Sequence, residues 1–308
     1  DLPIAEEIGD RRPDLDVHTA GDTAETRERL GEADVFVTNI HRWDDALLDG
    51  LSSGDLIQST SAGYAAFPVE TLDERGIALC TAAGVTAPTV SEHAFALALS
   101  FSRRLPVYAS RQRDRVWDRS DSRTLSDWAG ETLTVVGLGN IGERVARRGL
   151  GFDMTVHGVK RDPDAYDGCL DADAVFPSTE LSSVLPETDL LVLAVPLTDE
   201  TRGLIDEAAL DALPDSAVHV NVCRGPVVEE AALLDALDAG RLGGAGLDVF
   251  DEEPLPPESP LWDHERVILT SHVAGRSDAF VPRFVDLLLS NLDRRAAGEP
   301  LENQLTGP

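Results

Sequence analysis

Short apolar runs recur along the chain, and longer stretches with helical spacing separate most of them. Apolar runs of about four to eight residues are typical of buried strands, and their alternation with helices favours an α/β fold with parallel sheets. The runs that we predict as strands are ADVFVTN, DLIQST, GIALC, TLTVVG, MTVHGV, AVFP, DLLVLAVP, AVHVNV, GGAGLDV and RVILTS.

Helical patterns open and close the chain. It begins with LPIAEEIGD, whereas a doubly wound domain usually opens with a strand. We therefore expect that the first strand lies upstream of residue 1 and that the sequence is slightly truncated or renumbered. SEHAFALALSFSRRLPVYASRQR predicts one long helix from Ser91, capped by Thr89 or Ser91. SDAFVPRFVDLLLSNLDRRAAGEP predicts a final helix.

TLTVVGLGNIGERVARRG contains a glycine-rich loop between a predicted strand and a predicted helix. The G-x-G-x-x-G spacing in that context indicates a dinucleotide site, because the glycines allow a tight turn and a close approach of the backbone to a pyrophosphate. The free N–H groups at the helix start would bind the phosphates. The predicted contacts are Gly137, Leu138, Gly139, Asn140, Ile141 and Gly142.

The two series of strands predict two doubly wound parallel-sheet domains with a cleft between them. We expect a discontinuous flavodoxin-like domain from residues 1–91 and 277–308, and a Rossmann domain from residues 92–276. A length of 308 residues is in keeping with two domains.

The strand after the glycine loop ends in Lys160 and Arg161. An NAD site places an acidic residue there to bind the ribose 2′-hydroxyl, whereas two cations suit a 2′-phosphate. We therefore predict a preference for NADP(H), with NAD(H) possible. The alternative is that both cations lie in a solvated turn and that Asp162 binds the ribose of NAD.

The net charge of −30 argues against nucleic acid as the main partner. Lys160 is the only lysine, and acidic residues are spread along the chain. This composition resembles proteins from salt-loving microbes, since molar salt screens the self-repulsion. The alternative is an ordinary acidic protein encoded by GC-rich DNA.

Other features place the protein in the cytoplasm. Cys80, Cys169 and Cys223 are too few and too widely spaced for a disulfide framework or a zinc site, so we expect reduced thiols. No apolar run is long enough to span a bilayer, and no signal peptide is visible. No motif supports a metal ion.

Three polar residues follow predicted strands near the end of the chain: Arg224 in CRGPVV, Glu253 in DEEPLP and His272 in TSHVAG. Ligands of open α/β sheets bind at the carboxyl ends of strands, so we expect the three side chains to converge. His272 would donate a proton to a carbonyl oxygen, Glu253 would orient the ring and favour its protonated form, and Arg224 would bind a carboxylate. His93 and His219 we interpret as structural.

The glycine loop with the ordered Arg, Glu and His motifs resembles the D-isomer-specific 2-hydroxyacid dehydrogenase family over nearly the whole chain, and within it a haloarchaeal NADP(H)-preferring member. SAGYAAFPVETLDERGIALCTAAGVTAPTVSEHA also resembles the family's substrate-domain signature. The resemblance implies the same three catalytic roles, with Arg224 and His272 touching both cofactor and substrate. It further implies substrate contacts from the backbone of Ala62 and Gly63, and pocket walls from Tyr64 and Phe67. The implied cofactor contacts are Val195, Pro196, Thr201, Cys223, Asp248 and Gly275.

The resemblance also implies a homodimer through the cofactor domain, by way of residues 92–130. The prediction is therefore a 2-keto acid reductase that is adapted to salt. Alternatives within the family are a glyoxylate or hydroxypyruvate reductase and a phosphoglycerate dehydrogenase. A different class is a dinucleotide-sensing corepressor that binds proteins.

Overall fold

The computed structural model describes residues 2–307, with Arg123 described through its backbone alone. Contacts divide the chain into two compact units. Unit 1 contains the residues up to Thr86 and those from Ser277, and unit 2 is Ala87–Arg276. The boundary that we predicted after residue 91 therefore falls inside a helix that belongs wholly to unit 2.

Unit 1 is built on a four-stranded sheet of order β1-β2-β3-β11. The first three strands are parallel, and β11 pairs antiparallel with β3. The three parallel strands match the predicted runs, whereas β11 was not predicted, because its three residues carry no apolar pattern. The bounds are β1 Val35–Thr38, β2 Leu56–Ser59, β3 Ala78–Cys80 and β11 Gln304–Thr306.

Four α-helices accompany this sheet, and both the helical start and the final helix that we predicted are among them. Asp22 caps α2 by accepting a hydrogen bond from the amide of Glu25. The last helix, α10, buries a stripe that includes Phe284 and Leu288, and it ends at Gly298 in the left-handed conformation. The bounds are α1 Ile4–Arg11, α2 Thr23–Leu30, α3 Val69–Glu74 and α10 Phe280–Ala297.

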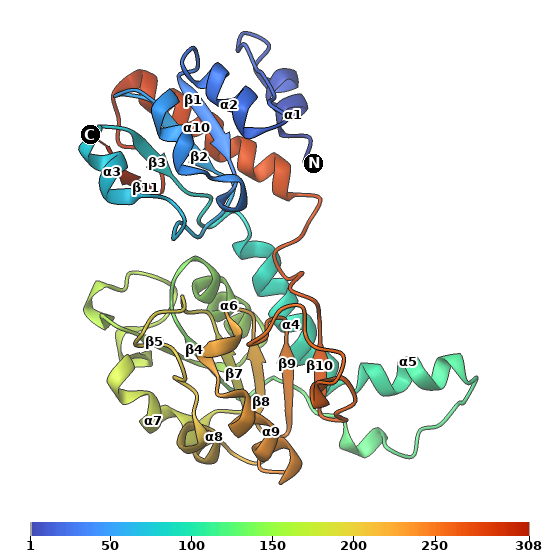
Figure 1. The fold of residues 1–308 in the computed structure, drawn as a ribbon. Coiled ribbons are helices and arrows are strands. Elements are labelled where there is room, and N and C mark those ends of the chain that lie inside the picture. The colour runs from blue at the N-terminus through green and yellow to red at the C-terminus, as the bar shows by residue number, and fades with distance from the viewer. Residues whose placement is uncertain (1, 308) are drawn as a thin grey trace. The chain divides into compact units, whose positions relative to one another are not determined.

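Unit 2 is built on a seven-stranded parallel sheet of order β10-β9-β8-β7-β4-β5-β6 (Figure 1). The chain starts at β4, continues outward to β6, and then returns to β7 on the other side of β4. The carboxyl ends of β4 and β7 therefore flank the point where the strand order reverses, which is where such sheets bind ligands. The bounds are β4 Thr132–Val136, β5 Thr155–Lys160, β6 Val175–Pro177, β7 Leu190–Leu193, β8 Val218–Asn221, β9 Gly244–Leu247 and β10 Val267–Leu269.

Both faces of this sheet are covered, as its continuous apolar strands require. On β7, Leu190 and Val192 pack into one hydrophobic cluster, and Leu191 and Leu193 pack into the other. The α-helices of unit 2 are α4 Ala87–Ser102, α5 Leu105–Arg113, α6 Asn140–Gly151, α7 Leu181–Val184, α8 Glu207–Ala212 and α9 Glu230–Asp238.

The single long helix that we predicted from Ser91 is wrong at its start and in its middle. The helix begins at Ala87, and the Ser91 hydroxyl donates to the Ala87 carbonyl oxygen at 2.7 Å instead of capping. It breaks at Arg104, which has φ 50°, and α5 then begins with Pro106 in its first turn. Proline has no N–H to continue a helix and fits a first turn, so its ring sets this break.

Short 3₁₀ helices complete the structure: η1 Ile40–Arg42, η2 Asp45–Gly50, η3 Ser122–Thr124, η4 Pro163–Ala165, η5 Ala172–Ala174, η6 Ser178–Glu180, η7 Leu185–Glu187, η8 Gly225–Val227 and η9 Pro260–Trp262. Within residues 2–307, no helix has both the length and the apolar character that crossing a bilayer needs.

Candidate active site

The glycine loop joins β4 to α6 as predicted, and its geometry depends on the missing side chains. Gly137 has φ 98°, and a Cβ there would lie 2.6 Å from the Ala194 carbonyl oxygen. A Cβ on Gly142 would collide with the Gly137 carbonyl oxygen, so this glycine allows the helix to pack against the strand. A Cβ on Gly139 would meet nothing within 4 Å. The backbone at Gly139 thus faces open space, and the loop fits a pyrophosphate.

The remaining loop residues have separate roles. Leu138 is buried and packs against Gly158 on β5, so its side chain supports the loop from below. Asn140 and Ile141 are the first residues of α6, and their amides lack acceptors within the helix. Those amides are available to bind an anion at the positive end of the helix.

The segment after β7 lies beside the glycine loop. A Cβ on Gly137 would lie 2.8 Å from Val195 Cγ1. Thr201 donates to the Pro196 carbonyl oxygen at 2.6 Å and accepts from the Thr198 amide at 2.8 Å. Val195, Pro196 and Thr201 therefore form one ordered turn at the carboxyl end of β7.

Lys160 and Arg161 stand at the carboxyl end of β5, next to β4 in the sheet. The Lys160 ammonium lies 3.4 Å from the Ala165 carbonyl oxygen, and Arg161 pairs with Glu200 at 3.4 Å. Glu200 belongs to the turn after β7, so Arg161 reaches across the carboxyl end of β4. Asp162 is exposed and precedes η4.

His272 and Glu253 are in direct contact. His272 Nδ1 lies 2.6 Å from Glu253 Oε2, and Glu253 Oε1 accepts the Phe250 amide at 3.1 Å. His272 has φ 52°, a left-handed conformation that non-glycine residues seldom adopt. Such strain at a polar loop residue is typical of functional positions.

Arg224 follows β8, whose neighbour β9 precedes Glu253 and whose next neighbour β10 precedes His272 (Figure 1). Its side chain is exposed, and its Nη1 donates to the Cys223 carbonyl oxygen at 2.5 Å. Arg224, Glu253 and His272 thus lie at the carboxyl ends of three adjacent strands of unit 2. This places a cation, a carboxylate and an imidazole along one edge of the sheet.

Comparisons with known proteins agree with this geometry. The family model for "D-isomer specific 2-hydroxyacid dehydrogenase, NAD binding domain" matches residues 95–274. The chain is 35% identical to glyoxylate/hydroxypyruvate reductase B of Enterobacter sp. (strain 638) over 259 residues, covering 82% of this chain and 78% of that protein. The chain belongs to the D-isomer specific 2-hydroxyacid dehydrogenase family. It is accordingly an NAD(P)-dependent oxidoreductase.

Solved structures of the family share the fold. A D-isomer specific 2-hydroxyacid dehydrogenase family protein from Aeromonas salmonicida has a TM-score of 0.82 at 30% identity, covering 97% of this chain and 94% of that one. A D-isomer specific 2-hydroxyacid dehydrogenase from Xanthobacter autotrophicus Py2, in complex with NADPH and MES, has a TM-score of 0.74 at 28% identity, covering 99% and 94%. The predicted α/β fold with its Rossmann-type domain is confirmed.

Asp248 is a buried residue of this dehydrogenase that organises residues 270–274, called the histidine loop because they include His272. It is 1% exposed, and its Oδ1 accepts the Thr270 hydroxyl at 2.6 Å and the Val273 amide at 2.9 Å. Its Oδ2 accepts the Ala274 amide at 2.9 Å. The carboxylate therefore fixes residues 270–274, and its predicted contact with the nicotinamide carboxamide stays a prediction.

Sequence reasoning missed Thr270 of this network and Asn221 beside Arg224. Thr270 links Asp248 to His93, whose Nε2 lies 2.9 Å from the Thr270 hydroxyl oxygen. Asn221 accepts the Cys223 amide and donates to the Arg224 carbonyl oxygen, each at 3.0 Å, and so shapes the turn before the arginine. An Asn at the end of an apolar strand is a known turn signal that could have identified it.

Cys223 and Gly275 lie in the same part of unit 2. Burial raises the pKa of the Cys223 thiol to about 11, so the thiol stays protonated at neutral pH and is a poor nucleophile. Cys223 packs in a hydrophobic cluster of unit 2, and its implied cofactor contact stays a prediction. Gly275 follows the histidine loop and is half-buried.

The predicted substrate contacts Ala62, Gly63 and Tyr64 lie in unit 1, after β2, and all three are exposed. We predicted that Phe67 would form a pocket wall, and the structure places it elsewhere. It is buried in the core of unit 1, with its ring 4.9 Å from that of Trp43. The Phe67 amide donates a hydrogen bond to the Tyr64 carbonyl oxygen and closes a turn between the two residues. This turn directs the Phe67 ring into the core.

Proposed function

We propose that the chain is an NADP(H)-preferring D-2-hydroxyacid dehydrogenase that reduces a 2-keto acid, with Arg224, Glu253 and His272 as its catalytic residues. The observation that carries this proposal is the 2.6 Å contact between His272 Nδ1 and Glu253 Oε2 at the strand ends of a dinucleotide-binding sheet. A structural histidine would have no need of a left-handed backbone beside a carboxylate of a neighbouring loop.

The contact defines the proton path. With Nδ1–H donating to Glu253, the Nε2–H of the imidazolium remains free to protonate the carbonyl oxygen of the substrate. Glu253 holds the ring plane and complements its positive charge, as carboxylates do in other histidine sites. A nicotinamide cofactor bound at the glycine loop would supply the hydride for the carbonyl carbon. In the reverse direction, His272 accepts the hydroxyl proton.

Arg224 offers a planar guanidinium for the carboxylate of the substrate, and can also polarise the carbonyl group. Its one side-chain hydrogen bond in the structure uses a single Nη1 donor, so most of the fork is available. The backbone amides of Ala62 and Gly63 and the ring of Tyr64, which belong to unit 1, remain the substrate contacts that the family resemblance implies.

Two cations support the preference for NADP(H). Lys160 and Arg161 occupy the strand end where a carboxylate would serve NAD, and Asp162 is exposed with its backbone directed into η4. Replacing Lys160 and Arg161 by neutral residues should raise the KM for NADPH far more than that for NADH. An unchanged ratio would argue for ribose binding by Asp162.

The substrate is proposed to be a small 2-keto acid. The relative from Enterobacter is named a glyoxylate/hydroxypyruvate reductase, so these two acids are the first candidates, and longer aliphatic 2-keto acids come next. A turnover assay with NADPH and NADH against a panel of 2-keto acids tests the proposal. We expect turnover with at least one acid and a higher kcat/KM with NADPH. Absence of turnover across the panel would contradict an enzymatic function.

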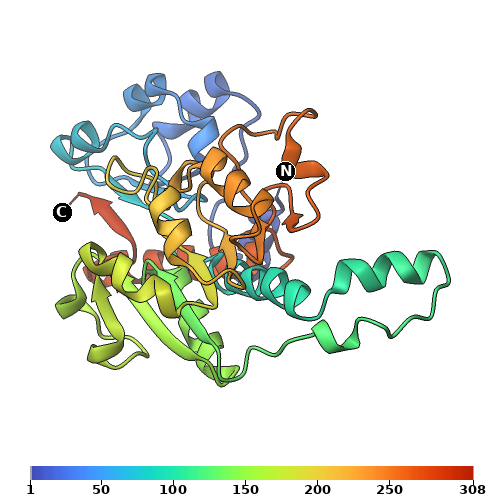
Figure 2. The ribbon, with the colours of Figure 1, turned by 90° about the horizontal axis from the view of Figure 1, so that it is seen from below.

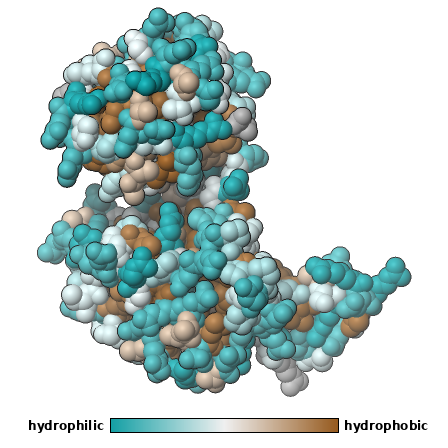
Figure 3. All heavy atoms as spheres, viewed as in Figure 1, coloured by the Kyte–Doolittle hydropathy of each residue, from teal (hydrophilic) through white to brown (hydrophobic). Residues whose placement is uncertain are grey.

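Adaptation to molar salt is a further part of the proposal. The net charge is −30, and hydrophilic side chains cover most of the visible surface of each unit (Figure 3). At about 1 M salt the Debye length is roughly 3 Å, so repulsion between the surface carboxylates is largely screened. We expect the melting temperature to rise as KCl increases from low to molar concentration.

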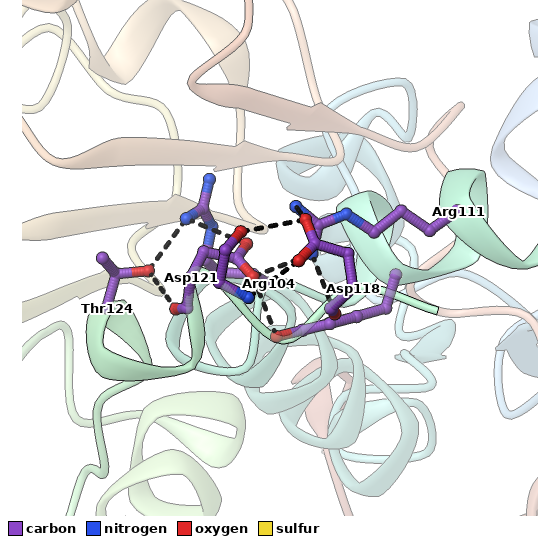
Figure 4. Close-up of polar contacts among 7 residues, drawn as sticks. Arg104, Arg111, Asp118, Asp121 and Thr124 are labelled. Carbon is purple, nitrogen blue, oxygen red and sulfur yellow. Dashed lines mark hydrogen bonds and ion pairs between the residues drawn. The ribbon is translucent and has the colours of Figure 1, made fainter. Parts of the chain in front are cut away.

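A homodimer through residues 92–130 is supported by an arm that extends from unit 2 in both ribbon views (Figures 1 and 2). Helix α5 buries none of its residues, and Trp117 is 93% exposed. Ion pairs of Arg111 with Asp118 at 3.3 Å and with Asp121 at 2.7 Å hold the returning segment against α5 (Figure 4). A preformed arm with an exposed aromatic suits a protein partner. Light scattering of the protein and of Trp117→Ser tests it.

A further inference from the structure

The only lysine of the chain is held by a ring face and a carbonyl group. Lys160 Nζ lies 5.5 Å from the centroid of the Tyr166 ring and 3.4 Å from the Ala165 carbonyl oxygen. Both contacts come from the segment that follows β5. An ammonium over an aromatic face is attracted by the ring quadrupole, and a lysine has three N–H donors, so these contacts leave donors unused.

Neither contact neutralises the lysine. Among the residues that the structure describes, no carboxylate pairs with Lys160, although the chain contains 56 acidic residues. Its neighbour Arg161 does pair with a carboxylate, that of Glu200. A carboxylate partner would compete with an incoming phosphate, whereas a ring face and a carbonyl oxygen fix the ammonium and leave its charge uncompensated.

The ring is itself anchored to the helix that follows the glycine loop. The Tyr166 hydroxyl donates to Glu143 Oε2 at 2.5 Å and accepts the Leu170 amide at 3.3 Å. Glu143 Oε1 accepts the Cys169 amide at 3.0 Å. Burial, together with the hydrogen bond to Glu143, raises the pKa of Tyr166, so the phenol keeps its proton and remains a donor.

Glu143 lies in the first turn of α6, directly after Gly142. The chain of contacts therefore runs from the start of the phosphate-binding helix, through Glu143 and the Tyr166 ring, to the ammonium of Lys160. The chain of contacts fixes the distance between the glycine loop and the Lys160 ammonium. The pyrophosphate and the 2′-phosphate that these two groups would bind belong to the same dinucleotide.

We propose that Tyr166, anchored by Glu143, is the positioning residue that holds the uncompensated ammonium of Lys160 for the 2′-phosphate of NADP(H). This inference rests on the proposed preference for NADP(H). It assigns a discriminating function to a residue that would itself contact neither the nicotinamide nor the substrate.

The test is a double-mutant cycle of Tyr166→Leu and Lys160→Met, read as the ratio of kcat/KM for NADPH to that for NADH. A cation–π contact is worth about 0.5–2 kcal/mol, so Tyr166→Leu should lower the ratio by roughly two- to thirtyfold. In the Lys160→Met background the same substitution should leave the ratio unchanged. Calorimetric binding of adenosine 2′-monophosphate and adenosine 5′-monophosphate gives a second readout that is independent of turnover.

Tyr166→Phe keeps the ring but loses the hydroxyl, and we expect a smaller fall in the ratio. It serves as the second variant if Tyr166→Leu does not fold. Arg147→Gln is the matched control, since Arg147 pairs with Glu143 Oε1 at 2.8 Å, whereas the Tyr166 hydroxyl donates to the other carboxylate oxygen, Oε2. Its ratio should stay within about twofold of the unmodified enzyme, the range expected for an exposed ion pair.

The outcomes separate this inference from the proposed cofactor preference. If Lys160→Met lowers the ratio but Tyr166→Leu and Tyr166→Phe do not, the positioning role is wrong and the preference for NADP(H) stands. If Tyr166→Leu lowers the ratio equally in both backgrounds, the tyrosine does not act through Lys160 and the inference is overturned. If Lys160→Met itself has no effect, the proposed 2′-phosphate site is wrong and the tyrosine has no cation to position.

Discussion

The two halves of the seven-stranded sheet hold their functional groups by different means. At the ends of β8, β9 and β10, the loops that carry Arg224 and His272 are fixed by Asn221 and Asp248, which are each 1% exposed. At the ends of β5 and β7, the proposed cofactor-binding residue Arg161 is held by a surface contact. Arg161 and Glu200 form an ion pair although their side chains are 77% and 76% exposed.

This difference predicts which half of the sheet is sensitive to mutation and which is sensitive to salt. A buried carboxylate that accepts several hydrogen bonds is shielded from salt, and losing one acceptor is costly. An exposed ion pair contributes little and is screened by salt. We therefore expect the chemistry of the β8–β10 half to be sensitive to mutation and indifferent to salt, and cofactor recognition in the β4–β7 half to show the reverse.

The largest effect is expected from removing the proposed proton donor, His272. His272→Gln keeps a hydrogen-bonding side chain but cannot deliver a proton, so kcat should fall by about 10²–10⁴-fold, the usual contribution of general acid catalysis. The Kd for NADPH should change little, as measured by fluorescence titration. A near-normal kcat would show that His272 is not the proton donor. The expected sensitivity of the β8–β10 half to mutation would then lose its main support.

The second prediction concerns His219, a fully buried residue of β8 in the half of the sheet formed by β8, β9 and β10. Neither ring nitrogen has a hydrogen-bond partner, and complete burial lowers the pKa of His219 from 6.5 to about 4. Between about pH 6.5 and pH 4, His219 binds a proton in the unfolded chain but stays neutral in the folded chain. Its contribution to the unfolding free energy is therefore present above about pH 6.5 and is lost as the pH falls to about 4. The loss approaches roughly 3 kcal/mol.

His219→Leu should therefore flatten the fall in unfolding free energy between pH 7 and pH 4.5, as measured by urea denaturation. Leucine suits the site, since His219 pairs with Leu191 and Ala245 on the same face of the sheet. His41→Gln, which changes an exposed histidine of unit 1, is the control and should keep the original slope. Equal slopes for all three proteins would show that His219 is not the titrating group.

Asp248→Asn tests the buried acceptor directly. The amide group can accept on one atom only, so one of the loop amides or the Thr270 hydroxyl loses its partner. We expect a loss of about 1–3 kcal/mol in unfolding free energy and a lower kcat, because the loop of His272 loosens. Both effects should be the same in low and molar KCl. A variant that matches the parent in both readouts would show that the carboxylate does not organise the loop.

The smallest effect is expected at the exposed pair. Glu200→Gln should change unfolding free energy by less than about 0.5 kcal/mol, because surface ion pairs contribute little. It should lower the KM for NADPH modestly in dilute buffer, since Arg161 is released, and leave it unchanged in molar KCl. An effect that persists in molar salt would contradict the contrast between the two halves.

Most of the fold could be predicted from apolar periodicity. Each of the ten predicted runs overlaps a strand of the structure, because a buried parallel strand needs a continuous apolar segment. The exceptions are β11, the start of α4 at Ala87 instead of Ser91, and the break before Pro106. The strand β11 is defined by its pairing with β3, and Arg104 adopts its left-handed conformation where α4 gives way to α5.

The sequence by itself determined the family, the glycine loop and the order of Arg224, Glu253 and His272, because these depend on residue type and spacing along the chain. Only the tertiary structure decided which side chains meet. Asp248 reaches Thr270 and residues 273–274, and Glu143 reaches Tyr166, across separations that no local pattern encodes. Such contacts arise from the order of strands in the sheet, which brings distant loops to one edge. The ring beside Lys160 comes from the segment just after β5, and Glu143 on α6 anchors it there.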